Sequence, residues 1–277
     1  MGKLRSLLKG IIPENILSKI PSSYDIIGDT IVIELPTSIR DYWRSIGEIL
    51  CKLHKHVKTV YVKVSGVKGD YRIREVTPVY GVVKHYTIHK EYGVKMVVNV
   101  PNVYFNPSLG YEHHRVANLV DEGETVYDMF SGVGGFSLHI ACRRNVTVYA
   151  SDINPHAILC LTLSTLINKL KGCIIPILGD AKIIASYLVR SVDRVIMNLP
   201  EKSHEYLGYA LKCLREDGGI IHYYHFDYSI SSFLKHFIAS ISTYGGRLVK
   251  IVHTRKVLEV APYKYLYVVD AYVIPNF

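Results

Sequence analysis

Three glycines within four residues, Gly132, Gly134 and Gly135, are the feature of this sequence that most directly suggests a ligand-binding loop. They follow the apolar run Val126–Phe130, which contains Asp128 and is typical of a buried parallel strand. The chain then resumes with the spacing of a helix. A strand that ends at glycines and leads into a helix lets backbone N–H groups approach a ligand closely. A plain tight turn has the same pattern, so the glycines alone leave both interpretations open.

Two further apolar runs also end in a carboxylate. Residues 146–152 and 174–180 predict strands that end in Asp152 and Asp180. In an open α/β sheet, an acid at the end of the second strand can accept hydrogen bonds from both ribose hydroxyls of a nucleoside. Each acid could instead cap the helix that follows it. The three acids together with the glycine loop favour a nucleoside-binding sheet.

The later strands indicate which nucleoside-binding class this is. Residues 194–200 and 219–224 predict a fourth and a fifth strand, and 247–253 with 263–273 predict a terminal strand pair. The glycine spacing departs from the G-x-G-x-x-G pattern that cradles a pyrophosphate. It resembles the S-adenosyl-L-methionine (AdoMet) site of Rossmann-like methyltransferases, whose ligand has no phosphate, and the strand pair is similar to the antiparallel last strand of that class.

This resemblance implies an α/β fold class. We expect a Rossmann-like AdoMet-dependent methyltransferase domain over residues 101–277, preceded by a smaller α+β RNA-binding domain over residues 1–100. The expected cofactor-binding residues are Asp128, Phe130, Gly132, Gly134, Asp152, Ile153, Asp180 and Asn198. The expected elements of the first domain are a helix over 4–20 interrupted at Pro13, two strands over 26–35 hinged at Gly28 and Asp29, a helix over 41–56, a strand over 59–64, and two or three more strands before residue 100.

Charge and aromatic rings suggest a nucleic-acid partner for the first domain. The formal net charge is +9, which points toward polyanions. Basic residues and tyrosines alternate between positions 52 and 92: Lys52, Lys55, Lys58, Lys63, Lys68, Arg72, Arg74, Lys84 and Lys90 with Tyr61, Tyr71, Tyr80, Tyr86 and Tyr92. Basic side chains contact phosphates, and aromatic rings stack on unpaired bases. Tyrosines that pack across strands are the alternative for each residue taken singly.

Composition excludes several other classes of protein. The 277 residues suit two modest domains or one large one, and no apolar run reaches the roughly 18 residues of a membrane span. Charges and Pro13 interrupt the first segment, so a signal peptide is not expected. The five cysteines are scattered without metal-ligand spacing, so we expect no metal, reduced thiols and a cytoplasmic location. A monomer is favoured.

Several separate motifs carry a closer resemblance. They are Tyr71–Gly81, Thr87–Gly93, Val103–Arg115, the glycine loop, Ser151–Pro155 and Asn198–Pro200, in this order. The chain resembles the archaeal and eukaryotic tRNA (guanine-N1)-methyltransferases, which modify guanosine 37, the base 3′ to the anticodon. The resemblance runs from about residue 7 to the end, so the extra small N-terminal domain of many members is expected to be absent. It implies tRNA as the partner.

The same resemblance implies the catalytic residues. Glu112 matches the general base of the family. A base is needed because N1 of guanine is a poor nucleophile until its proton is removed. Arg72 matches a cation that stabilises the charge developing on O6. Tyr104 matches a tyrosine of the methyl-transfer pocket, and Asn198 and Pro200 match the loop that holds the target base. Without the resemblance, Glu112 has the pattern of an ordinary charge at the start of a helix.

One departure and three alternatives accompany this assignment. Ser108 stands where the family usually has Arg, so one phosphate or substrate contact is expected to be missing or supplied from elsewhere. A wybutosine-pathway enzyme of the same architecture transfers the aminocarboxypropyl arm of AdoMet, but resembles Gly-Tyr where this chain has Asn198-Leu199-Pro200. A bifunctional methyltransferase that also acts on a tricyclic guanosine fits the same residues. A non-catalytic RNA-binding protein is disfavoured by the intact acids and loop.

Overall fold

The computed structural model describes residues 3–66, 69 and 71–276, and divides the chain into two compact units, Met1–Pro107 and Ser108–Phe277. The division lies seven residues after the position expected from the sequence. Lys68, one of the expected RNA-contacting lysines, lies outside the described residues. No helix among the described residues is long and apolar enough to cross a membrane.

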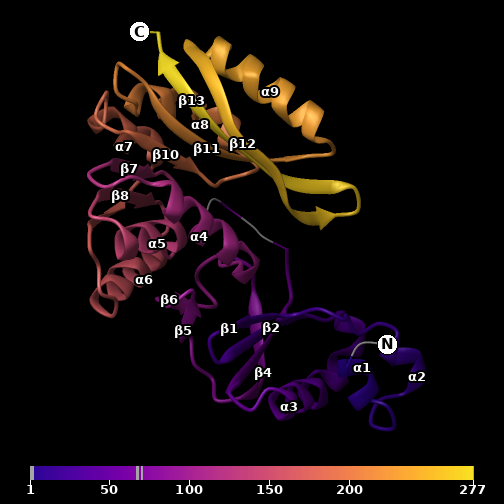
Figure 1. The fold of residues 1–277 in the computed structure, drawn as a ribbon. Helices are drawn as coiled ribbons and strands as arrows, with labels where there is room; N and C mark the ends of the chain where they lie inside the picture. Colours follow the sequence, from indigo (N-terminus) through magenta and orange to yellow (C-terminus); the bar gives the residue numbers. More distant parts are fainter. Residues whose placement is uncertain (1–2, 67–68, 70, 277) are drawn as a thin grey trace. The chain divides into compact units, whose positions relative to one another are not determined.

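The first unit contains a four-stranded sheet with helices packed against it (Figure 1). Its elements are α1 (Lys3–Leu7), α2 (Glu14–Leu17), β1 (Asp25–Ile27), β2 (Thr30–Glu34), η1 (Thr37–Tyr42), α3 (Trp43–Leu53), β3 (Thr59–Lys63), β4 (Val76–Gly81), β5 (Tyr86–Glu91) and β6 (Val94–Asn99). The sheet order is β1-β2-β3-β4, with β2 and β3 parallel because α3 forms the crossover between them. Strands β5 and β6 form a separate antiparallel hairpin.

Two of the predicted breaks between elements have clear physical causes. The helix expected over 4–20 is two short helices, α1 and α2, which lie on either side of Pro13. The hinge between β1 and β2 is at Gly28, whose φ is 56°. A Cβ atom there would lie 2.3 Å from Oγ1 of Thr87 and 2.4 Å from the carbonyl oxygen of Ile88, so only glycine fits.

The second unit is built around a seven-stranded sheet of order β12-β13-β11-β10-β7-β8-β9. Its elements are α4 (Gly110–Leu119), β7 (Thr125–Asp128), α5 (Gly135–Arg143), β8 (Thr147–Asp152), α6 (Pro155–Leu166), β9 (Cys173–Leu178), α7 (Ala181–Tyr187), β10 (Arg194–Met197), α8 (Ser203–Cys213), β11 (Gly219–Asp227), α9 (Ile230–Thr243), β12 (Gly246–Ala261) and β13 (Lys264–Pro275); the short helix η2 (Pro107–Leu109) precedes α4. Strands β7 to β11 are parallel, and β13 is antiparallel to both β11 and β12. The expected Rossmann-like sheet with a terminal antiparallel pair, preceded by a smaller mixed domain, is therefore confirmed.

The order of strands locates the ligand-binding edge of this sheet. Strand β7 lies between β8, the next strand along the chain, and β10. Chain connections therefore leave β7 in one direction first and later return to its other side. Such a reversal opens a crevice at the carboxyl ends of the strands, where α/β sheets bind ligands. The glycine loop and the loop after β10 both begin at this edge.

The two faces of the sheet differ in what covers them. Tyr223 and Val269 belong to a large apolar core shared with Phe233 and Phe237 of α9. The opposite face of the same strands carries His222, Tyr224 and Asp270. Side chains alternate along a strand, so His222 and Tyr224 lie on one face and Tyr223, between them, lies on the other face in the apolar core.

Candidate active site

The glycine loop places two glycines in left-handed conformations for different reasons. Gly134 has a φ of 93° and precedes α5, and a Cβ there would lie 2.3 Å from Cδ1 of Leu161. Gly132 has a φ of 54°, and a Cβ there would meet nothing within 4 Å. Gly134 is therefore required for close packing of the turn on α6, whereas Gly132 borders open space that a ligand could enter.

Asp128 at the end of β7 is fully buried beside this loop. Its Oδ2 accepts a hydrogen bond of 2.6 Å from Oγ of Ser137, while its Oδ1 has no hydrogen-bond partner among the described residues. Burial, with a smaller contribution from the nearby Asp152, raises the pKa of Asp128 to about 7. A buried carboxylate oxygen without a partner is costly, so this position suits a donor or a cationic group of a ligand.

Asp152 at the end of β8 ties the glycine loop to the sheet. Its Oδ2 accepts a hydrogen bond of 2.9 Å from the N–H of Gly132, and its Oδ1 accepts one of 2.8 Å from the N–H of Asn154. Burial raises the pKa of Asp152. The N–H of Ile153 is a further backbone donor to Asp152, and a carboxylate with about four acceptor positions still has room for another donor, as a ribose-binding acid requires.

The other expected cofactor-binding residues follow the carboxyl ends of the same strands or of the neighbouring β9. Asp180 lies two residues after β9 and caps α7, accepting a hydrogen bond of 2.8 Å from the N–H of Lys182. The capping alternative is therefore present for Asp180. Ile153 is half-buried, and the ring of Phe130 makes an edge contact with Tyr206 at 4.9 Å between centroids.

The loop Asn198–Pro200 follows β10 directly, at the same edge of the sheet as the glycine loop. Asn198 is half-buried and Pro200 is buried. Oγ of Ser203 donates to the carbonyl oxygens of Met197 and Leu199, at 3.2 and 2.9 Å, and so fixes the backbone of this loop. The sheet thus brings Asn198, Asp128 and the glycines together at the ends of neighbouring strands.

Glu112 in the first turn of α4 is buried, with its side chain only 1% exposed. Its Oε2 accepts three hydrogen bonds: two from Nε and Nη2 of Arg115, at 3.0 and 2.9 Å, and one from the Tyr224 hydroxyl, at 2.9 Å. Its Oε1 has no hydrogen bond to a described residue and lies 3.3 Å from Nη1 of Arg255 in an ion pair. Glu112 is therefore not the solvated helix-start charge that its local sequence suggests.

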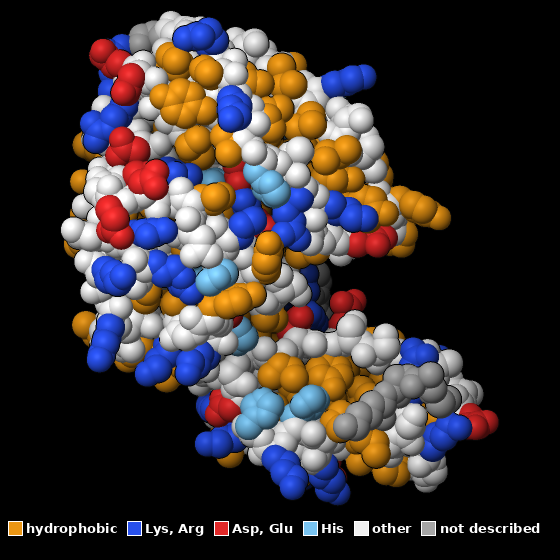
Figure 2. Space-filling view, in the orientation of Figure 1, with side chains coloured by type: hydrophobic (Ala, Val, Ile, Leu, Met, Phe, Trp, Pro, Cys, Tyr) orange, Lys and Arg blue, Asp and Glu red, His pale blue; other side chains and the backbone are white. Residues whose placement is uncertain are grey.

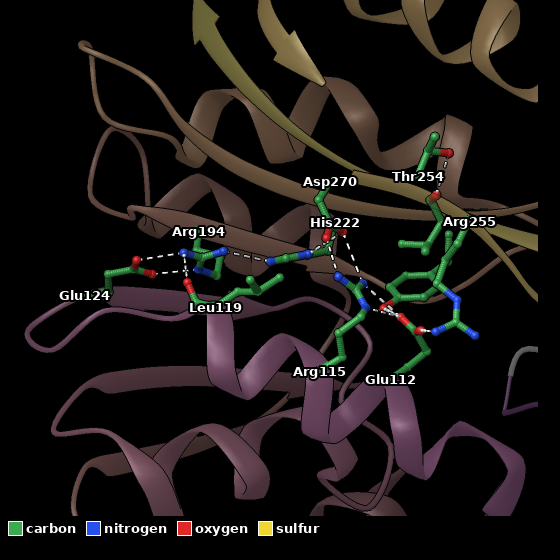
Figure 3. A network of polar contacts seen from close by, with 11 residues as sticks. Glu112, Arg115, Leu119, Glu124, Arg194, His222, Thr254, Arg255 and Asp270 are labelled. Atoms are coloured by element: carbon green, nitrogen blue, oxygen red, sulfur yellow. Dashed lines mark hydrogen bonds and ion pairs between the residues drawn. The ribbon is translucent and has the colours of Figure 1, made fainter. Parts of the chain in front are cut away.

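Glu112 is one end of a buried chain of ionisable side chains, shown in Figure 3. Arg115 also donates to both carboxylate oxygens of Asp270, and Oδ1 of Asp270 lies 2.7 Å from Nδ1 of His222. Nη1 of Arg194 lies 2.9 Å from Nε2 of His222. Arg194 in turn donates to both oxygens of Glu124, at 2.6 and 2.7 Å, so the chain of contacts is continuous.

Strand register explains why these residues meet. His222 of β11 and Asp270 of β13 are direct cross-strand partners, so their side chains lie on the same face of the sheet. Tyr224, two residues further along β11, lies on that face too and reaches Glu112. Arg255 comes from β12, where its backbone pairs with Val268 of β13.

Burial and charge pairing compete in this chain, and each decides the direction of one pKa shift. Burial alone would raise the pKa of Asp270, but His222 and Arg115 outweigh it and hold that pKa well below its ordinary value. Burial lowers the pKa of His222, against the opposing influence of Asp270. Since an arginine can only donate, Nε2 of His222 accepts the hydrogen bond from Arg194. The ring proton of the neutral His222 is therefore on Nδ1, which faces Asp270.

The first unit holds two of the expected catalytic residues next to each other. The guanidinium carbon of Arg72 lies 4.9 Å from the centroid of the Tyr104 ring, a cation–π contact. Arg72 has a φ of 53°, a left-handed conformation that is uncommon outside glycine.

The basic and aromatic cluster of the first unit is only partly available to a ligand. Lys63 and Lys84 form ion pairs with Asp25 and Asp29, and Tyr61 is buried. The exposed members include Lys55, Lys58, Lys90, Tyr71, Tyr86 and Tyr92. Figure 2 shows Lys and Arg side chains spread over the visible face of the molecule.

Sequence reasoning missed Arg115, Tyr224, Arg255, Asp270 and the His222 link between them. One signal was present: Asp270 interrupts the otherwise apolar and aromatic run that follows Lys264 in β13. A carboxylate inside a buried strand must be paired, so its position predicts a cationic or hydrogen-bonding partner. The identity of that partner was not readable from the local pattern.

Comparisons with known proteins agree with this arrangement. A family model described as the TRM5/TYW2 methyltransferase domain matches residues 87–242, and one described as the TYW2 N-terminal domain matches residues 4–84. A Pyrococcus abyssi protein named tRNA (guanine(37)-N(1))-methyltransferase Trm5b is 38% identical, over 94% of this chain and 77% of its own length. A Saccharolobus solfataricus protein named tRNA 4-demethylwyosine(37)-methyltransferase Taw21 is 34% identical, over 72% of this chain and 76% of its own length.

Comparisons with solved structures also find Trm5 proteins. The crystal structure of Pyrococcus abyssi Trm5b has a TM-score of 0.84 and 37% identity, covering 95% of this chain and 78% of that one. The complex of aTrm5 with tRNALeu has a TM-score of 0.82 and 33% identity, covering 97% and 77%. Methanocaldococcus jannaschii Trm5 in complex with adenosine has a TM-score of 0.81 and 32% identity, covering 99% and 78%. On the family model and the identity to these relatives, the chain belongs to the TRM5/TYW2 methyltransferase family.

Proposed function

We propose that this protein transfers a methyl group from AdoMet to N1 of guanosine 37 in tRNA. The observation that carries the proposal is the buried Glu112, whose Oε2 is saturated by donors while its Oε1 makes no hydrogen bond with a described residue and has only the ion pair with Arg255 at 3.3 Å. A carboxylate held in this way is suited to accept one proton at one defined oxygen. The tRNA (guanine(37)-N(1))-methyltransferase and the tRNA complex among its relatives support the choice of substrate.

The residues at the carboxyl edge of the sheet fit the proposed cofactor. Asp152 would accept from the ribose hydroxyls, Gly132 would admit the ligand to the loop, and the unpaired Oδ1 of Asp128 would face a donor or cationic group. AdoMet supplies an electrophilic methyl group on a positively charged sulfur. The related structure in complex with adenosine supports a nucleoside as part of the ligand.

Glu112 would remove the N1 proton of the target guanine through Oε1. Because Arg115 and Tyr224 already occupy Oε2, the carboxylate cannot turn to present either oxygen at random. Asn198 and Pro200 would hold the base, as their place in the loop after β10 suggests. Arg72 would stabilise negative charge on O6, with Tyr104 beside it, since loss of the N1 proton places that charge on O6.

A second substrate is favoured by one specific observation. The Saccharolobus solfataricus relative is named for methylation of 4-demethylwyosine at the same tRNA position, and this chain spans 76% of its length. The chemistry would use the same cofactor and edge of the sheet. Transfer of the aminocarboxypropyl arm is the other alternative, and it gives a product of different mass.

The test is nucleoside mass analysis after incubation of the protein with AdoMet and tRNA, followed by single-turnover rates. Two tRNAs should be compared, one with guanosine and one with 4-demethylwyosine at position 37. We expect 1-methylguanosine from the first. Aminocarboxypropylated guanosine, or no reaction with the guanosine tRNA, would overturn the proposal.

Glu112→Gln tests the role of the base within the same assay. Glutamine keeps the size of the side chain and a carbonyl acceptor but cannot take up the proton. The single-turnover rate should fall by about 10²–10⁴-fold, the usual contribution of a general base, while affinities for AdoMet and tRNA change little. A rate within a few-fold of the wild-type value would rule Glu112 out as the base.

A further inference from the structure

Arg115 occupies an unusual position between two buried carboxylates. Its Nε and Nη2 donate to a single oxygen of Glu112, and its Nη1 and Nη2 donate to the two oxygens of Asp270. The side chains of Glu112 and Asp270 are each 1% exposed, and that of Arg115 is 11% exposed. A planar guanidinium that is bound on two sides is held in one orientation. Its two hydrogen bonds to Glu112 then fix the orientation of that carboxylate as well.

Asp270 is itself fixed by the far half of the chain of contacts. His222 presents its Nδ1–H to Oδ1 of Asp270, because Arg194 occupies Nε2. Arg194 is locked by Glu124 and also donates to the carbonyl oxygen of Leu119, at the end of α4. The helix that carries Glu112 is therefore attached to the sheet at both ends by the same chain of contacts.

A buried series of charges is an expensive way to stabilise a fold. Desolvation of each ion costs several kcal/mol, and apolar residues of similar volume are often as stable or more so. Pairing on both sides does, however, hold a side chain in a single orientation. A reacting group must be held to within about 0.5 Å of its working geometry, and packed hydrogen-bonding partners provide this.

We propose that Asp270 is a positioning residue that acts through Arg115 to hold Glu112 with Oε1 directed at its substrate. The proposal rests on the function proposed above and deepens it, because the hydrogen bonds of Asp270 go to Arg115 and His222 and so reach Glu112 only indirectly. It assigns a catalytic consequence to a residue in the middle of a strand, 155 residues beyond Arg115 in sequence.

Asp270→Asn is the direct test, because asparagine keeps the shape and one carbonyl acceptor but loses the charge. Arg115 then keeps its own charge but is held firmly on one side only. We expect the single-turnover methylation rate to fall by about 10–100-fold, the usual effect of losing a charge-assisted hydrogen bond. Calorimetric affinities for AdoMet and tRNA should stay within about threefold of the wild-type values, since Asp270 is buried and is bonded to Arg115 and His222.

A double-mutant cycle separates positioning from general damage. If Asp270 acts only through Glu112, adding Asp270→Asn to Glu112→Gln should lower the remaining rate by less than about twofold, because the group being positioned is already disabled. A structural role predicts that the two losses multiply. Equal losses in both backgrounds, or a single-mutant rate within about threefold of wild type, would overturn the proposal.

Two further variants keep the result interpretable. Asp193→Asn is the control for loss of a paired carboxylate in the same unit, because Asp193 bonds to Arg215 and to the N–H of Thr125, outside the chain of contacts to Glu112. It should leave the rate unchanged. Should Asp270→Asn fail to fold, Arg115→Lys takes its place, since one ammonium group cannot hold both carboxylates as the guanidinium does.

Failure of this proposal is distinguishable from failure of the proposed function. Absence of 1-methylguanosine with the wild-type protein would overturn the proposed function and the positioning role with it. Wild-type methylation together with an unaffected Asp270→Asn variant would overturn the positioning role alone.

Discussion

Asp128 gives the sharpest test of the cofactor site, because its protonation should control ligand affinity. Burial raises its pKa to about 7 in the free protein. The ionised carboxylate is the form that would accept from a donor or pair with a cation, so binding should favour it. With a pKa near 7, about nine-tenths of the groups are ionised at pH 8 and about one-tenth at pH 6. AdoMet affinity should therefore fall about tenfold from pH 8 to pH 6.

The assay is calorimetric titration of the wild-type protein and of Asp128→Asn at both pH values. Binding should release up to about one proton from Asp128 near pH 6, which titrations in buffers of different ionisation enthalpy would count. The variant should bind more weakly at pH 8 and retain only the pH dependence that belongs to AdoMet itself. Equal wild-type affinity at both pH values, or the same dependence in the variant, would refute the reasoning.

The same pKa makes a prediction about the stability of the ligand-free protein. The pKa of Asp128 is higher in the folded protein than in the unfolded chain. The contribution of Asp128 to the free energy of unfolding is therefore fully present at low pH and is lost as the pH rises through 7. Asp128→Asn should therefore be more stable than wild type at pH 8, by at most about 4 kcal/mol, and the advantage should vanish near pH 4. Thermal unfolding at the two pH values measures this difference. A variant that is less stable at pH 8 would contradict it.

Two other predictions concern the ligands. Asp152→Ala should weaken AdoMet binding by about 1.5–3 kcal/mol, the range for loss of a charged hydrogen-bonding partner, and unchanged calorimetric affinity would remove Asp152 from the ribose. Affinity for tRNA should fall linearly with the logarithm of salt concentration, because exposed basic residues such as Lys55, Lys58 and Lys90 would release counterions from phosphates. A binding constant that stays flat from low to moderate salt would count against a basic tRNA surface.

Local pattern was enough to predict the sheet and its ligand-binding edge. Short apolar runs become buried parallel strands where both faces are covered, as at β7 and β10. The runs at β8 and at the more exposed edge strand β9 were also identified from the sequence. Asp128 and Asp152 end β7 and β8 as predicted. The carboxyl ends of parallel strands share one edge, so these residues converge without further information.

Local pattern did not decide which acids were free to bind. Asp180 and Asp152 look alike in sequence, yet Asp180 caps α7 while the oxygens of Asp152 fix the glycine loop. The difference arises because β9 ends two residues before Asp180, whereas β8 runs through Asp152 itself. Element boundaries are the least reliable part of any reading of a sequence.

The environment of Glu112 was decided by tertiary structure alone. Its sequence neighbours suggest an exposed charge on a helix, and only Arg115, one turn further along α4, could have been paired with it locally. Tyr224, Arg255 and Asp270 reach it or Arg115 through the register of β11, β12 and β13. Register depends on how whole strands pair, and the contacts that join α4 to these strands span 112 residues for Tyr224 and 155 for Asp270, which no local periodicity records. The sequence therefore determined that a carboxylate stands at position 112, and the packing of α4 on the sheet determined that it is buried and held by Arg115 and Tyr224.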